Sequence, residues 1–269
     1  MNLQGLTIGQ YFPGTSVIHR LDPRTKILAV VLLSVMIFLP KAWPGYAVTV
    51  AFSLLAVVLS QVPIKYILRG LRPILIILAI TVVFNAFLTP GTPVWHYGRL
   101  MITREGLVLS AVATVRLVLL VVTASLLTLT TSPIQLTDGL ERLLRPLSPL
   151  GVPAHELALM MTIALRFIPT LADEADRIMR AQMARGADMQ SGSLVNRIKA
   201  LIPIMVPLFV AAFRRADELA TAMEARGYRG GKGRTRMKEL LFAGSDYVAW
   251  VVLLAYGAGV VYLRVTGRG

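Results

Sequence analysis

Long apolar runs separated by short polar segments dominate the chain. They cover about residues 26–42, 45–62, 71–89, 107–131 and 247–264. Each approaches or exceeds the ~20 residues that a helix needs to cross the hydrocarbon core of a bilayer. The first run is the shortest and contains Pro40, so its ends are the least sharply defined. The pattern predicts an all-α polytopic membrane protein with about five transmembrane helices.

A different pattern, charged and helical in period, fills about residues 132–245. Apolar residues recur there at three- and four-residue spacing in two long stretches, which are separated by the polar segment 190–193. This spacing predicts two long amphipathic helices. We therefore expect three parts: 1–131 with four transmembrane helices, 132–245 as a cytoplasmic coupling domain of long crossed amphipathic helices, and 246–269 with the last transmembrane helix.

Two local sequences mark where helices begin. Asp22 is a good N-cap residue, and Pro23 follows at the first helical position, where proline is best tolerated. Ser132-Pro133-Ile134-Gln135 has the pattern of a capping box, again with proline at the first position. The second sequence predicts a short helix that ends near Leu144.

Both long amphipathic helices end in the same triplet. Ala184-Arg185-Gly186 recurs 41 positions later as Ala225-Arg226-Gly227, and at the same offset Ala175-Asp176 falls on Ala216-Asp217. Glycine just past the last helical residue adopts the left-handed conformation at little cost, and arginine complements the negative end of a helix. One copy alone is most simply a basic residue before a helix cap. Two copies suit docking into two acidic grooves of a partner.

Composition and charge place the chain in a membrane and orient it. Hydrophobic residues make up 55% of the chain, too many for an ordinary soluble domain. The formal charge of +14 does not indicate nucleic-acid binding, because the basic residues lie in loops between apolar runs. Sixteen Lys and Arg residues fall between positions 133 and 245. By the positive-inside rule this region and the N-terminus are cytoplasmic. The segments on the opposite side then hold only Lys41, Arg99, Arg104, Arg264 and Arg268.

Residues suited to catalysis or metal binding are scarce. The chain has no cysteine and three histidines, and the His-Glu-x-x-His spacing of zinc sites is absent. Residues 227–233 approach a phosphate-binding loop, but Arg226 stands where its first glycine belongs and Gly233 where its Ser or Thr belongs. We expect no catalytic residues, no bound cofactor and no metal in this chain.

Arg116 falls midway along the fourth apolar run. A charge inside the membrane is a candidate functional residue. The other interpretation is an arginine satisfied by a neighbouring helix, for instance by Asn85 on the third run. The sequence leaves both open.

The chain resembles the transmembrane T component (EcfT) of energy-coupling factor transporters. Six sequences carry the resemblance, in this order: Gly9-Gln10-Tyr11, Ser16 to Arg24, Thr130-Thr131-Ser132-Pro133, Leu165-Arg166-Phe167-Ile168-Pro169, Ala181 to Gly186, and Ala222 to Tyr228. The resemblance implies a non-catalytic scaffold in a prokaryotic cell membrane. It would join two ABC-type ATPase subunits, which bind the ATP, to a substrate-binding membrane S component. The two Ala-Arg-Gly triplets would dock on the ATPases, and the opening sequence is most similar to T components shared among vitamin transporters.

Two other functions remain as alternatives. One is a self-contained secondary transporter, although acidic residues within the apolar runs are scarce and no inverted repeat is visible. The other is a metal-dependent membrane enzyme that uses Asp173, Glu174 and Asp176.

Overall fold

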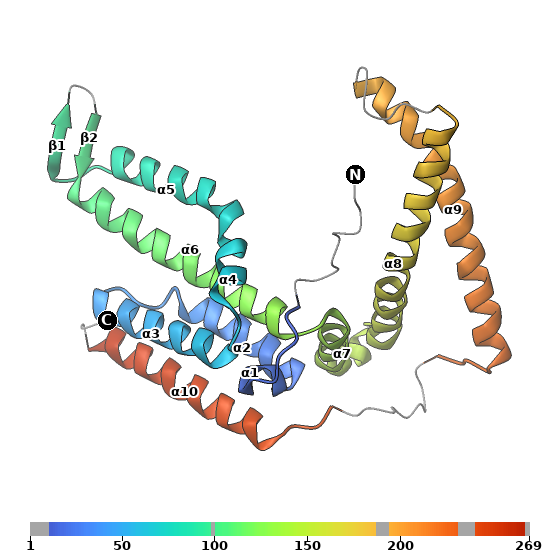
Figure 1. Ribbon diagram of the computed structural model, residues 1–269. Coiled ribbons are helices and arrows are strands. Elements are labelled where there is room, and N and C mark those ends of the chain that lie inside the picture. The colour runs from blue at the N-terminus through green and yellow to red at the C-terminus, as the bar shows by residue number, and fades with distance from the viewer. Residues whose placement is uncertain (1–10, 98–99, 187–193, 231–239, 267–269) are drawn as a thin grey trace. The chain divides into compact units, whose positions relative to one another are not determined.

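The computed structural model describes residues 11–97, 100–186, 194–230 and 240–266, which form two compact helical units (Figure 1). The larger unit lies within Gly9–Gly139 and Leu240–Gly269, and the smaller unit lies within Leu140–Glu239. The predicted all-α polytopic class is confirmed, and one small β-hairpin is added to it.

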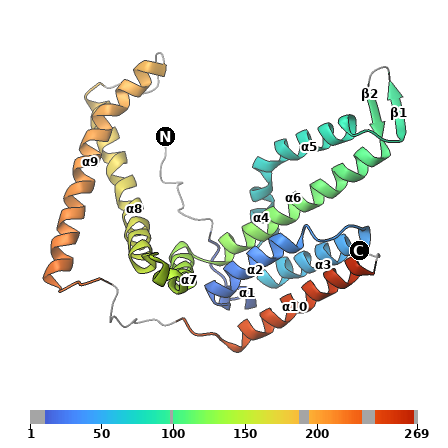
Figure 2. The same cartoon turned by 180° about the vertical axis from the view of Figure 1, so that it is seen from behind.

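Helix α6 (Arg104–Thr130) is central to the larger unit, because most of the other helices contact it. The last helix, α10, returns to the start of the chain and packs against α2 and α3, as Figure 2 shows from behind. The other helices of this unit are α1 (Val17–Arg20), α2 (Pro23–Met36), α3 (Trp43–Ser60), α4 (Ile64–Leu71), the 3-10 helix η2 (Arg72–Ile74), α5 (Leu75–Leu88) and α10 (Gly244–Val265).

A two-stranded hairpin connects α5 to α6 within the Gly- and Pro-rich segment 90–106 (Figure 1). Strand β1 (Pro93–Tyr97) runs antiparallel to β2 (Leu100–Thr103), with Tyr97 opposite Leu100 and Pro93 opposite Thr103. The register shifts between Pro93 and Trp95. Because Pro93 has no N–H to donate, it is suited to the end of such a strand.

Five helices in the described part of the chain are long and apolar enough to cross a membrane: α3, α4 to α5 (Ile64–Leu88), α6, α8 (Ala154–Ala184) and α10. The number agrees with the predicted one, but the run at 26–42 is not among the five helices and α8 is. The run at 26–42 forms only the 14-residue helix α2, because the chain turns after Met36 and passes through Pro40. Helix α8 is long and apolar enough instead, since its N-terminal half is apolar on nearly every face, although the charge pattern places its region in the cytoplasm.

Buried and exposed apolar residues in the larger unit have distinct roles. Val62, Ile67, Leu126 and Leu129 form a buried cluster that holds α4 against the end of α6. Tyr256 of α10 stacks on Phe52, and its hydroxyl donates to Thr49 Oγ1 at 3.0 Å, which fixes α10 on α3. Large apolar side chains elsewhere on the spans are exposed, as expected for surfaces that face lipid.

The smaller unit is built on two long helices, α8 and α9 (Leu194–Ala225). It also contains the last residues of α7 (Pro133–Leu144) and the 3-10 helix η3 (Arg145–Leu150). The capping box predicted at the start of α7 is confirmed. Gln135 N–H donates to Ser132 Oγ at 3.3 Å, and Ser132 N–H donates to Gln135 Oε1 at 3.1 Å.

Candidate docking site at the ends of two long helices

Helix α8 ends at the first Ala-Arg-Gly triplet as its sequence predicts. Gly186 has φ +86°, a left-handed conformation that glycine adopts at little cost. Its N–H donates to the carbonyl of Met183 at 3.0 Å, and Arg185 N–H donates to that of Ala181 at 3.2 Å. These bonds satisfy carbonyls that the end of a helix would otherwise leave unpaired. The helix therefore stops at Ala184 with Arg185 exposed beside its negative end.

The second triplet ends α9 with the same kind of glycine cap and with one further backbone hydrogen bond. Gly227 has φ +69°, and its N–H donates to Glu224 O at 2.8 Å. Tyr228 N–H donates to Met223 O at 3.0 Å, which completes a Schellman motif. Arg226 is exposed at this end. The predicted role of both glycines as helix caps is confirmed, and the docking role of the two triplets stays a prediction.

The two triplets lie at opposite ends of one helix pair. In both views the chain runs along α8 and returns along α9 (Figures 1 and 2), and the two helices contact each other. Between the ends, Arg215 Nη2 of α9 lies 3.5 Å from Glu174 Oε2 of α8. Glu174 is one of the three carboxylates of the metal-enzyme alternative, and here it pairs with arginine.

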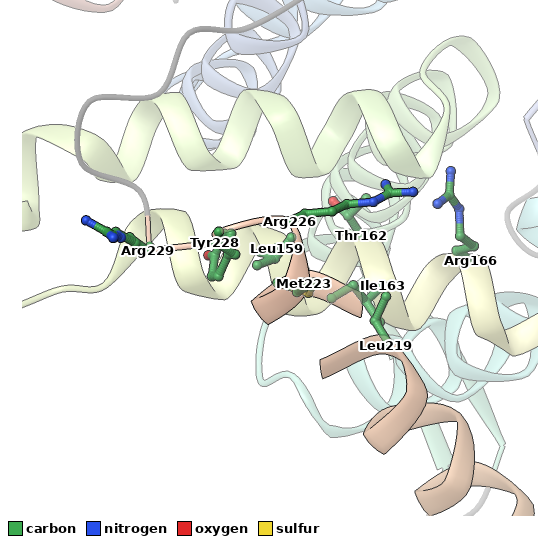
Figure 3. A pocket seen from close by; sticks show the side chains of 11 residues that line it. Leu159, Thr162, Ile163, Arg166, Leu219, Met223, Arg226, Tyr228 and Arg229 are labelled. Carbon is green, nitrogen blue, oxygen red and sulfur yellow. The ribbon is translucent and has the colours of Figure 1, made fainter. Parts of the chain in front are cut away.

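Arg226 also lines a pocket of about 560 Å³ between the end of α9 and the N-terminal half of α8 (Figure 3). Arg166 and Thr162 of α8 line the same pocket, and the side chain of Arg226 extends toward that of Arg166. The rest of the lining comes from Leu159, Ile163, Leu219, Met223, Gly227, Tyr228, Arg229 and Gly230. Sequence reasoning missed the position of Arg166 in this site. Its one signal was its place in the sequence Leu165 to Pro169, which contributes to the family resemblance.

Three buried charged residues, Asp22, Lys26 and Asp246, and the partly buried Arg24 tie the ends of three helices in the larger unit. Asp246, only 1% exposed, accepts from the backbone N–H of Asp22 at 2.8 Å and of Ala243 at 2.9 Å. The predicted N-cap is confirmed, because Asp22 Oδ1 accepts from Arg24 N–H at 2.8 Å. The Arg24 guanidinium donates twice more to the Asp22 carboxylate, and this hydrogen bonding raises the pKa of Arg24. These contacts hold the start of α2 against the start of α10.

Lys26 and Arg24 connect this group to neighbouring backbone. Burial lowers the pKa of Lys26, which lies outside the five candidate spans, to about 8. The side chain is therefore still largely charged at neutral pH, and it donates to the carbonyls of His19 at 3.0 Å and Thr130 at 2.9 Å. Arg24 donates to Leu240 O at 3.0 Å and lies 4.2 Å from the ring centre of Phe242. The group thereby joins the segment before α2, the end of α6 and the segment that leads into α10.

The partners of Arg116 are different from the one suggested by its sequence. Its Nη2 donates to the Tyr46 hydroxyl at 2.6 Å and lies 3.4 Å from Pro40 O, whereas the sequence had suggested Asn85. The guanidinium also lies over the rings of Phe38, at 5.4 Å, and Tyr46, at 5.6 Å. Asn85 was wrong because the helix that faces Arg116 is α3 rather than α5.

Fold and site together define a class: a polytopic α-helical membrane protein whose smaller unit carries two exposed, capped arginine ends. Residues 14–237 match the family CbiQ, described as a cobalt transport protein. Similar proteins include the energy-coupling factor transporter transmembrane protein EcfT of Acidaminococcus fermentans, 53% identical over 97% of this chain and 98% of that one. The EcfT proteins of Clostridium kluyveri (56%, 92% of each chain) and Bacillus subtilis (46%, 97% and 99%) are also similar.

The chain belongs to the CbiQ family and, within it, to the energy-coupling factor transporter transmembrane proteins. It is therefore a multi-pass membrane protein and the transmembrane component of such a transporter.

Proposed function

We propose that the chain is the energy-coupling scaffold of an ABC-type importer. It joins two ATPase subunits to a substrate-binding membrane component, and the complex takes up vitamins or related micronutrients. The partner ATPases bind and hydrolyse ATP, and the chain itself carries out no chemistry. The N-terminus and the smaller unit face the cytoplasm, in agreement with the sixteen basic residues between positions 133 and 245.

The observation that carries the proposal is the pair of capped helix ends. Arg185 and Arg226 are exposed, and each follows the last residue of a helix of more than thirty residues. A Cβ added at Gly186 or Gly227 would meet nothing within 4 Å, so the space beside each end is open. A guanidinium presented in this way is suited to a carboxylate in a partner groove.

A mechanism follows from the attachment of both ends. ATP binding closes the ATPase pair, and each arginine end moves with the groove that holds it. Because the two ends belong to two packed helices, their movement changes the angle between α8 and α9. The apolar faces of these helices hold the substrate-binding component, which then reorients in the bilayer and releases its substrate.

Charge reversal at the two ends tests the proposal. Tagged full-length chain is purified in mild detergent from its native membranes as wild type, Arg185→Glu, Arg226→Glu and Arg264→Glu. The last variant is the control, since Arg264 is an exposed arginine in the last turn of α10. Wild type and control should retain two ATPases and one or more small membrane proteins, whose identity names the substrates.

Each reversal at Arg185 or Arg226 should lower ATPase retention and abolish ATP-driven uptake while the chain still inserts. If both single variants keep wild-type retention and uptake, the coupling role is rejected. Purified chain that transports substrate alone in liposomes would favour the secondary transporter instead.

A further inference from the structure

The two arginine ends differ in their surroundings, and the difference concerns the pocket beside Arg226. That pocket is lined by three arginines, Arg166, Arg226 and Arg229, and no Asp or Glu belongs to its described lining. Neither Arg166 nor Arg226 forms an ion pair within the described residues. A cluster of like charges around a concave surface is unfavourable unless an anion neutralises it.

We infer that this pocket receives a carboxylate side chain of an ATPase partner, and that Arg166 binds it together with Arg226. The inference rests on the proposed function and deepens it. In the proposed function, Arg226 enters a groove of the partner. In the further inference, an acidic side chain of the partner also enters a pocket of this chain, where Arg166 of α8 and Arg226 at the end of α9 both bind it.

Charge and shape both favour a protein carboxylate as the occupant. The Arg226 side chain extends from the end of α9 toward that of Arg166 on α8 (Figure 3), and both line the same pocket, so both guanidinium groups can donate to one carboxylate that enters it. The apolar side chains of Leu159, Ile163, Leu219 and Met223 form much of the remaining wall. When a partner covers the pocket, these apolar side chains exclude water from around the bound carboxylate, which strengthens its attraction to an arginine. The pocket also continues directly into the Arg226 end that the proposed function places against an ATPase.

The position of the pocket links docking to the geometry of the helix pair. Arg166 lies twelve residues into α8, whereas Arg226 follows the last residue of α9. One carboxylate held by both arginines would therefore fix the end of α9 against the beginning of α8. Partner binding at this end would set the angle between the two helices as well as attach the ATPase.

The test measures how much ATPase co-purifies with variants of the full-length chain, and it distinguishes the inference from the proposed function on which it rests. The variants are Arg166→Glu, Arg166→Ala, Arg226→Glu and, as control, Arg177→Glu, which changes an exposed arginine three turns further along α8 and outside the pocket. A glutamate at position 166 can pair with Arg226, so it neutralises the pocket from within and the fold is retained. Loss of a charged hydrogen bond lowers affinity roughly tenfold or more, so retention should fall by this factor for both Arg166 variants and stay unchanged for the control.

The results discriminate between the two claims. Wild-type retention by Arg166→Glu, combined with loss of the ATPases from Arg226→Glu, overturns the inference and leaves the proposed function intact. Wild-type retention by Arg226→Glu contradicts the docking role that the proposed function gives to Arg226, and the inference with it.

A cross-linking arm identifies the occupant directly and does not depend on retention. The chain has no cysteine, so Arg166→Cys gives one unique attachment point for a thiol-reactive photo-cross-linker. An adduct with an ATPase peptide that contains Asp or Glu supports the inference. Adducts confined to phospholipid would overturn it and assign the arginines to an anionic headgroup.

Discussion

Glu174 and Arg215 contact each other from equivalent positions of the two long helices. Glu174 lies eleven residues before Arg185, and Arg215 lies eleven residues before Arg226. The pair therefore repeats the 41-residue offset of the two triplets. At 1.5 Å per residue, each lies about 16 Å along its helix from the corresponding arginine. In an antiparallel pair, the contact therefore marks a crossing midway between the two ends.

Exchange of these two charges tests whether the crossing matters for coupling. Glu174→Arg and Arg215→Glu each place like charges opposite one another, whereas the double variant restores an opposite pair. Both side chains are about one third exposed, so the cost to stability should be at most about 1 kcal/mol per single variant. We expect both single variants to lower ATP-driven uptake and the double variant to recover it. A double variant with uptake no better than either single one would show that the contact does not set the crossing.

Replacement of Gly227 by alanine should weaken the end of α9 through its backbone alone. A Cβ there would meet no atom within 4 Å, so the cost comes from the left-handed φ of +69° and should be about 1–2 kcal/mol. Thermal unfolding in detergent and ATPase retention should both decrease for Gly227→Ala. They should decrease less for Gly227→Asn, because asparagine tolerates this conformation better than alanine.

The matched control for this change is Gly259→Ala in α10. Its Cβ would also meet nothing within 4 Å, but it lies inside a helix, where alanine is favoured over glycine. Equal effects of the alanine variants at 227 and 259 would contradict a special role for the cap geometry.

Local features of the fold could be predicted from the sequence, because they depend on neighbouring residues. The N-cap at Asp22, the capping box at Ser132 and the left-handed glycines Gly186 and Gly227 each involve contacts within a few positions. The spans α3, α6 and α10 were predictable for a related reason, since an uninterrupted apolar run of sufficient length is a local property.

Features that depend on tertiary contacts were missed or assigned wrongly. Tyr46 lies 70 positions from Arg116, and no periodic pattern connects the two. Arg166 and Arg226 meet in one pocket only because α9 returns along α8. Hydropathy at 26–42 likewise does not reveal that the helix in this run ends at Met36.

Asp246 should be essential for the attachment of α10. Its two oxygens accept from two different backbone N–H groups, those of Asp22 and Ala243, in a nearly fully buried position. In Asp246→Asn one oxygen becomes an NH₂ group, so one of the two backbone N–H groups loses its acceptor, at a cost of about 1 kcal/mol or more. We expect a lower unfolding temperature for the purified chain, with Asp217→Asn, an exposed acid on α9, as the unchanged control. An unfolding temperature equal to that of the wild type would show that this anchor contributes little to stability.

Removal of one hydroxyl should distinguish the two interpretations of Arg116. The Tyr46 hydroxyl accepts from Arg116 and donates to Pro40 O at 2.8 Å, so Tyr46→Phe takes away the shortest hydrogen bond of a partly buried cation. This change should cost about 1–3 kcal/mol of stability. Arg116→Met should cost less, because it removes the charge itself and leaves the Tyr46 hydroxyl bound to Pro40.

Thermal unfolding of both variants shows which of them loses more stability. Tyr262→Phe, on an exposed face of α10, is the control. If Arg116→Met is the more stable variant and also supports uptake, the arginine is satisfied by its neighbours and has no separate role. A stable Arg116→Met chain that keeps its ATPases but no longer supports uptake would assign the intramembrane charge to transport itself.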